Sequence, residues 1–138
     1  MRVANIRSLI FLFLVAAALL PACGEHKKVP LLFEVLEADK TGLHFTNKLT
    51  PGDSFNVFHY MYFYNGAGLG ASDLNNDGLI DLFFASNQAE NKLFLNTGNL
   101  QFKDVSAAAQ IPQDGGWNTG ISIVDINNDG LLDIYICR

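Results

Sequence analysis

Two short acidic segments carry the residues of this chain that are best suited to bind a ligand. The segment DLNNDGLID spans Asp73 to Asp81, and the nearly identical DINNDGLLD spans Asp125 to Asp133. In each segment, aspartates occupy positions 1, 5 and 9, asparagine occupies position 3 and glycine occupies position 6. Three carboxylates held this close together repel one another strongly unless a cation lies among them. The spacing therefore predicts a cation site in each segment.

Calcium is the ion that this set of donors suits. It takes about six to eight oxygen ligands, often from alternate positions of one loop. Oxygen-only ligation disfavours zinc and copper, and magnesium demands a more compact octahedron. The glycine at position 6 permits a sharp turn in the middle of the loop. The predicted ligands, with each leucine supplying its main-chain carbonyl, are Asp73, Asn75, Asp77, Leu79 and Asp81 in the first loop and Asp125, Asn127, Asp129, Leu131 and Asp133 in the second.

Two other interpretations of these loops are an EF-hand and a turn without metal. An EF-hand requires a glutamate at position 12 and flanking helices. Position 12 here is Phe84 or Ile136 and the flanking sequence is strand-like, which excludes the EF-hand. A turn rich in Asn and Asp needs no metal, because these side chains bond to their own backbone. This alternative stays open, although two copies at a fixed offset favour the ion.

The acidic loops belong to an internal repeat. Residues 66–86 align with residues 118–138 at an offset of 52 without a gap. Each unit is predicted to form a strand, an acidic loop and a second strand. The runs LFFAS and IYIC are apolar on both faces, as in a sheet packed between other sheets. In the first unit, NKLFLN and LQFKDV add two strands joined by a hairpin turn at TGN. Four strands in about 50 residues form one propeller blade.

We therefore predict an all-β fold of about one and a half β-propeller blades, with the repeat region at 66–138 and its second repeat truncated. Propellers need roughly four to eight blades to close, so the sequence is expected to be an N-terminal fragment of a longer protein. Residues 31–65 are predicted to contribute further strands, one of them in the aromatic run SFNVFHYMYFYNG. A carbohydrate-stacking platform is the alternative for these aromatic residues.

The first 22 residues are typical of a secretory signal peptide. Leu9–Leu20 is an unbroken apolar run, which as a helix rises about 18 Å and is too short for a hydrocarbon core of about 30 Å. The sequence LPAC ending at Cys23 resembles a bacterial lipobox, in which the cysteine carries lipid, and ordinary secretion is the alternative. We expect a lipid anchor at Cys23, a polar tether over 23–30, and a location in the bacterial cell envelope, at the outer membrane or cell surface.

Composition excludes several functions. The formal net charge is −5 and no basic stripe is present, so nucleic acid is not an expected partner. No G-x-S-x-G elbow occurs, and His44 and His59 are predicted to be strand residues, so the chain is not expected to be an enzyme. With Cys23 acylated, Cys137 would have no disulfide partner, and its apolar neighbours predict a buried thiol.

Beyond these patterns, GAGLGASDLNNDGLIDLFFASN resembles an FG-GAP/VCBS repeat, the calcium-loop blade of integrin-α-like propellers. NKLFLNTGNLQFKDVSAAAQI is similar to a segment of bacterial proteins that carry a C-terminal ASPIC/UnbV domain. The resemblance covers about residues 41–138, and the segments GLGASD and DGGWNTG depart from the family pattern in strand packing rather than in ligands.

The resemblance implies that each acidic loop binds calcium and joins the first two strands of a blade. It implies a surface-exposed lipoprotein that serves as a binding or scaffolding module for proteins or glycans. The alternative is the non-catalytic propeller portion of a larger secreted enzyme.

Overall fold

The computed structural model describes residues 31–112 and 115–138. The compact unit Val35–Arg138 contains all the elements discussed below, and of the unit Met1–Glu34 only the last four residues are described. The predicted signal peptide, the tether and Cys23 therefore lie outside the described residues. Among the residues that are described, no helix is both long and apolar enough to span a bilayer.

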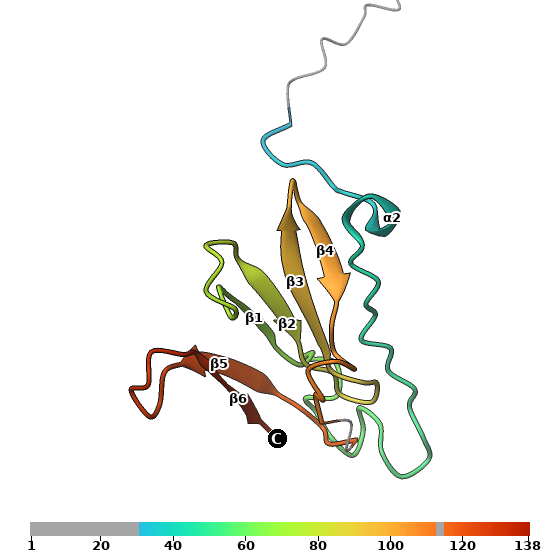
Figure 1. The fold of residues 1–138 in the computed structure, drawn as a ribbon. Coiled ribbons are helices and arrows are strands. Elements are labelled where there is room, and N and C mark those ends of the chain that lie inside the picture. Colours follow the sequence, from blue (N-terminus) through green and yellow to red (C-terminus); the bar gives the residue numbers. More distant parts are fainter. Residues whose placement is uncertain (1–30, 113–114) are drawn as a thin grey trace, which may run out of the picture. The chain divides into compact units, whose positions relative to one another are not determined.

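The fold is all-β, as predicted, and its strands form two antiparallel sheets (Figure 1). The first sheet has the strand order β1-β2-β3-β4, and the second consists of β5 and β6. Sequence neighbours pair throughout, which is the arrangement expected of one four-stranded blade and part of a second. The strands are β1 (Leu69–Ser72), β2 (Asp81–Phe84), β3 (Lys92–Gly98), β4 (Gln101–Asp104), β5 (Gly120–Val124) and β6 (Asp133–Cys137).

Each acidic loop joins two strands of one hairpin, β1 to β2 and β5 to β6, as the repeat predicts. The hairpin between β3 and β4 turns at Asn99 and Leu100, whose φ angles are 55° and 58°. Positive φ at both central residues is the requirement of a type I′ turn, whose twist matches that of paired strands. The predicted four strands of the first repeat are thus confirmed.

The core lies where the two sheets pack face to face. Phe83, Ala85 and Leu93 of the first sheet form its centre. Ile121, Ile134 and Ile136 of the second sheet pack against them, together with apolar side chains from the connecting segments. A two-stranded hairpin is at best marginally stable by itself in water. The β5–β6 hairpin therefore depends on this contact for its apolar face to be buried.

Two glycines of the first repeat allow the sheets to approach closely. A Cβ atom placed on Gly68 would lie 2.7 Å from Cγ1 of Ile121 and 3.0 Å from the main-chain carbon of Gly120. A Cβ atom on Gly70 would lie 2.6 Å from Cδ1 of Ile123. The missing side chains therefore provide the space that the isoleucines occupy.

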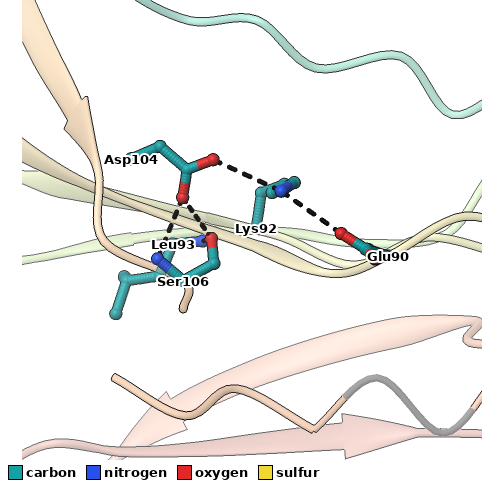
Figure 2. Close-up of polar contacts among 5 residues, drawn as sticks. All are labelled: Glu90, Lys92, Leu93, Asp104 and Ser106. Atoms are coloured by element: carbon teal, nitrogen blue, oxygen red, sulfur yellow. Dashed lines mark hydrogen bonds and ion pairs between the residues drawn. The ribbon is translucent and has the colours of Figure 1, made fainter. Parts of the chain in front are cut away.

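Hydrogen bonds and an ion pair connect the start of β3 to the end of β4 (Figure 2). The buried Ser106 hydroxyl accepts a hydrogen bond from the Leu93 amide at 2.9 Å and donates one to Asp104. Lys92 lies 3.3 Å from Asp104 and 3.4 Å from Glu90. Desolvation acts to raise the pKa of Asp104, but the bonds from Ser106 and Lys92 outweigh it and hold the pKa below its usual 3.8.

The strands predicted within residues 31–65 are absent from the structure, which is a correction to the sequence analysis. The segment EADKTG forms a single turn of helix, α2 (Ala38–Thr41), which ends at Gly42 in the left-handed region at φ 78°. The segment that follows, which contains His44, runs without strand pairing. Its polar groups bond individually to the first repeat, for example the Thr50 amide to Gln88 at 2.6 Å.

The aromatic run also forms turns rather than a strand. The Asn56 side chain bonds to the Gly52 carbonyl at 2.8 Å and to the Phe58 amide at 2.9 Å. The amides of His59 and Tyr60 donate to the Asn56 carbonyl. Local bonds of this kind compete with strand pairing. They explain why the aromatic content did not produce the predicted strand, and His59 is consequently an exposed turn residue.

Cys137 is exposed, which corrects the prediction of a buried thiol. It lies on the side of β6 that faces away from the first sheet, in register with Gly120. Within the described residues, no further sheet covers that side. The run IYIC is apolar on both faces, but among the described residues only one of these faces is packed against another sheet.

We predict that Gly68→Val lowers the free energy of unfolding by about 1–3 kcal/mol, because the new side chain collides with backbone that cannot move aside cheaply. Gly52→Val is the matched control, since a Cβ atom at Gly52 meets nothing within 4 Å. Chemical denaturation followed by Trp117 fluorescence measures both. Equal stability of the two variants would contradict the close sheet contact.

Candidate functional site

The first acidic loop is folded by its own side chains. The carboxylate of Asp73 accepts hydrogen bonds from the amides of Asp77 at 3.0 Å and Gly78 at 2.8 Å. The side-chain oxygen of Asn75 accepts a hydrogen bond from the Asp77 amide at 3.0 Å. The Asp77 carboxylate accepts from the Leu79 amide and from the Asn75 side chain, both at 2.8 Å. The predicted ligand residues thus accept hydrogen bonds from main-chain amides that would otherwise have no partner in the tight turn.

The second loop repeats this geometry residue for residue. Asp125 accepts from the amides of Asp129 at 3.0 Å and Gly130 at 2.8 Å, and Asp129 accepts from the Leu131 amide at 2.8 Å. Asn127 bonds to Asp129 through both its oxygen and its amide group. Two independent copies of one bonding pattern show that the nine-residue sequence specifies the loop conformation.

The backbone of each loop passes twice through the left-handed region. Asn76 and Asn128 have φ angles of 60° and 58°, and Gly78 and Gly130 have φ angles of 85° and 87°. Asparagine and glycine are the residues that adopt this conformation at least cost. The glycine predicted to form the sharp turn does so in both loops.

Position 9 differs between the loops in its surroundings. Asp81 is fully buried, and its two oxygens accept hydrogen bonds from the Leu74 amide at 2.9 Å and the Asn96 amide at 2.8 Å. Asn96 belongs to β3, so this carboxylate links the loop to a third strand. Asp133 accepts from the Ile126 amide at 3.0 Å and is half-buried. Sequence reasoning did not identify Asn96, because its contribution is a main-chain amide.

The donor chemistry of the loops fits calcium, since every predicted ligand offers an oxygen. Each carboxylate can accept more bonds than it makes to the loop. The described residues do not, however, bring three or more His, Cys, Asp or Glu side chains together in a group that could hold a metal ion. The carboxylates are turned instead toward the loop amides, as in the metal-free turn that sequence reasoning left open.

The same amide bonds affect the acidity of the second loop. The Leu131 amide, and next the Asn127 side chain, stabilise the charged form of Asp129 and outweigh a small desolvation effect. The pKa of Asp129 is consequently lowered from 3.8. Its carboxylate is therefore ionised, and able to attract a cation, at any neutral pH.

A buried network of amide side chains was missed by the sequence analysis. It joins the two repeats and the N-terminal segment. Asn87 donates to the Asn118 carbonyl at 2.7 Å and to the Gly66 carbonyl at 3.2 Å. Asn47 donates to Asn87 at 2.6 Å, and Asn118 donates to the Ser86 carbonyl at 2.7 Å. Isolated asparagines carry no periodic signal, so only the fold reveals them.

Several aromatic residues of the run SFNVFHYMYFYNG pack around Trp117. Its ring centroid lies 4.7 Å from that of Phe55, 5.2 Å from that of Phe63 and 5.9 Å from that of Tyr60. Phe63 is fully buried by these contacts. We use the name aromatic patch for the large apolar side chains of the same segment that are more than half exposed, which are three aromatic residues and one methionine: Phe58, Met61, Tyr62 and Tyr64.

Comparison with known proteins identifies the repeat. Residues 73–136 match the family model of the FG-GAP-like repeat. The match begins at the first aspartate of the first loop and ends at Ile136 in β6, so it includes both acidic loops. No curated protein and no solved structure matches the chain. The chain therefore carries FG-GAP-like repeat sequence, and its two sheets are consistent with partial blades of a propeller-type module.

We predict that Asp81→Ala lowers the free energy of unfolding more than Asp133→Ala does. Loss of the Asp81 carboxylate leaves the partly buried Leu74 and Asn96 amides without their acceptor, at up to about 1–3 kcal/mol for each donor. Asp133→Ala removes the acceptor of the exposed Ile126 amide. Chemical denaturation in the presence of a chelator measures both without any contribution from metal. Equal losses would show that the link to β3 contributes nothing.

Proposed function

We propose that this chain is a calcium-binding module of the FG-GAP type that is displayed at the bacterial cell surface and binds a partner rather than catalysing a reaction. The observation that carries the proposal is the pair of acidic loops. They have the same sequence spacing and the same conformation, and both lie within the region that matches the FG-GAP-like repeat.

The residues proposed to hold calcium are the ten that sequence analysis selected. In each loop they are the two Asp residues at positions 1 and 5, the Asn at position 3, the leucine carbonyl and the Asp at position 9. Bound calcium would supply positive charge that offsets the repulsion among these carboxylates. The chain itself supplies the curled backbone, through residues of positive φ, and the strand ends to which the loop is attached.

Calcium is expected to bind at two sites and to raise the stability of the chain. Free calcium at ten times the dissociation constant would add about 1.4 kcal/mol for each site, since it binds the folded state alone. Isothermal titration calorimetry should give a stoichiometry near two. Asp77→Ala and Asp129→Ala should each reduce it to one, and the double variant should abolish the heat.

Because the mutated carboxylates also bond to loop amides, a loss of stability in either variant is not sufficient evidence by itself. The decisive quantity is the difference in unfolding temperature between calcium and chelator, measured for each variant. Asp53→Ala, which removes an exposed acid outside both loops, is the control. Identical unfolding temperatures of the unmodified chain in calcium and in chelator would contradict the calcium proposal.

The proposed partner is a protein or a glycan. The aromatic patch supports a binding role, because exposed clusters of large apolar side chains commonly mark interaction sites. Phe58 is 94 % exposed, and Asn56 and His59 beside it offer polar groups. Binding to arrays of glycans and of surface proteins would separate the two partner classes. An absence of binding to either class would favour the alternative, a non-catalytic portion of a larger secreted enzyme.

Membrane attachment is proposed to occur through lipid on Cys23, since LPAC resembles a lipobox. We predict that Cys23→Ser moves the chain from the membrane fraction to the soluble fraction of a bacterial host, because the lipid can no longer be attached. Incorporation of labelled fatty acid measures the modification directly. Cys137→Ser is the control, and retention of lipid by the Cys23→Ser chain would contradict the anchor.

A further inference from the structure

An open hollow lies among the turns that precede the first repeat. Its volume is about 430 Å³, which falls within the roughly 300–1,000 Å³ of small-molecule sites. No residue of either acidic loop lines it, so it is separate from the proposed calcium sites. The lining residues are Pro51, Gly52, Asp53, Asn56, Val57, Phe58 and Tyr64.

The backbone around the hollow is held in shape by the Asn56 side chain. Its amide group donates to the Gly52 carbonyl at 2.8 Å, and its oxygen accepts from the Phe58 amide at 2.9 Å. The Gly52 amide donates in turn to the Phe55 carbonyl at 3.0 Å. Because these bonds close the turn without any ligand, little ordering entropy opposes binding there.

Two aromatic rings of the lining are available to a ligand. Tyr64 packs edge to face against the fully buried Phe63, with ring centroids 5.0 Å apart, yet it remains 63 % exposed. Phe58 is exposed almost completely. Both rings therefore present apolar area that a ligand in the hollow can cover, and the Tyr64 ring is held in position by a core residue.

Asp53 provides the charge of the hollow. It is exposed, and among the described residues its carboxylate takes part in no hydrogen bond or ion pair. It is also the only lining residue that is charged at neutral pH. The carboxylate can accept hydrogen bonds from hydroxyl groups, and it repels an anion. The lining thus suits a neutral ligand with hydroxyl donors and an apolar face.

We propose that this hollow binds a neutral oligosaccharide. A pyranose ring has a face of C–H groups that can lie against Tyr64 or Phe58, and hydroxyl groups at its edge that can donate to Asp53. This assignment rests on the proposed function, because it selects the glycan from the two partner classes given there and places it outside the acidic loops.

A cationic ligand is less suited to the hollow, although Asp53 would attract it. The hollow is open to water, where both an ion pair and a contact between a cation and an aromatic ring are weak. An oligosaccharide can instead combine hydrogen bonds with apolar contact over the area of a ring. Choline, a small quaternary ammonium ion, is the probe for this alternative.

The first test is calorimetric titration of the full chain with neutral oligosaccharides of glucose, mannose and galactose. Each is compared with the oligosaccharide of the corresponding uronic acid and with choline. We expect binding of at least one neutral oligosaccharide and severalfold weaker binding of its uronic-acid counterpart, because Asp53 repels the added carboxylate. Absence of binding to every neutral oligosaccharide, or tighter binding of choline, would overturn the proposal.

Two substitutions test whether the hollow is the site. Phe58→Ala and Tyr64→Ala should each weaken binding by at least about tenfold. Tyr62→Ala is the matched control, because Tyr62 is also an exposed ring of the aromatic patch but does not line the hollow. Phe58 is too exposed to support the core, so its variant stays informative if Tyr64→Ala does not fold. Equal effects of Phe58→Ala and Tyr62→Ala would overturn the assignment.

Asp53→Asn tests the role of charge, since it keeps the size of the side chain. It should narrow the difference in affinity between a neutral oligosaccharide and its uronic-acid counterpart. An unchanged difference would contradict the role given to Asp53.

The calcium proposal and this one fail in different ways. Asp53→Asn should leave the calcium stoichiometry near two, whereas Asp77→Ala should lower it and leave the binding of oligosaccharide intact. Binding of oligosaccharide without any calcium binding would contradict the calcium proposal alone. Calcium binding together with an oligosaccharide affinity that Phe58→Ala leaves unchanged would overturn the hollow alone.

Discussion

The close contact between the two sheets is the constraint on which the rest of the structure depends. Gly68 and Gly70 have no side chains, so Ile121 and Ile123 can approach the first sheet closely. Ile121 packs there against the core cluster that contains Phe83. Without that contact the β5–β6 hairpin would have no buried face, and the second acidic loop would have no fixed base. A substitution in β1 therefore affects a loop more than 50 residues farther along the chain.

Several polar side chains of the structure share one physical role, which is to bond to main-chain groups near strand ends. Asp73 and Asp125 do so inside the loops, Asp81 does so between the first loop and β3, and Ser106 does so between β3 and β4. Asn118 is an exception in part, since its buried side-chain oxygen has no hydrogen-bond partner among the described residues. Its amide group nevertheless bonds to Ser86 and Asn91 and ties the second repeat to the first.

The sequence predicted the repeated part of the fold well and the N-terminal part poorly. The offset of 52 and the alternation of apolar runs with acidic loops determined the strand pairs, because a repeat supplies the same evidence twice. Residues 31–65 have no second copy. There, aromatic content favoured a strand, but side-chain bonds of Asn56 and packing against Trp117 produced turns instead. Tertiary context of this kind overrides β propensity.

The candidate site was predictable in its residue types but not in its bonding. Spacing selected all five positions of each loop, and the structure shows why position 6 is glycine. The spacing alone could not show that the carboxylates bond to loop amides. Nor could it show that Asp81 bonds to Asn96, since that contact spans 15 residues and joins two strands. The buried asparagines were equally invisible, because their partners are main-chain groups brought together only by the fold.

The bond from the Asn96 amide to Asp81 holds the first loop against a strand that belongs to a different hairpin. Opening this loop must therefore break a contact outside the loop itself, which is expected to slow exchange of its amides with solvent. A loop held in this way is preorganised, so less ordering entropy opposes the capture of a ligand there.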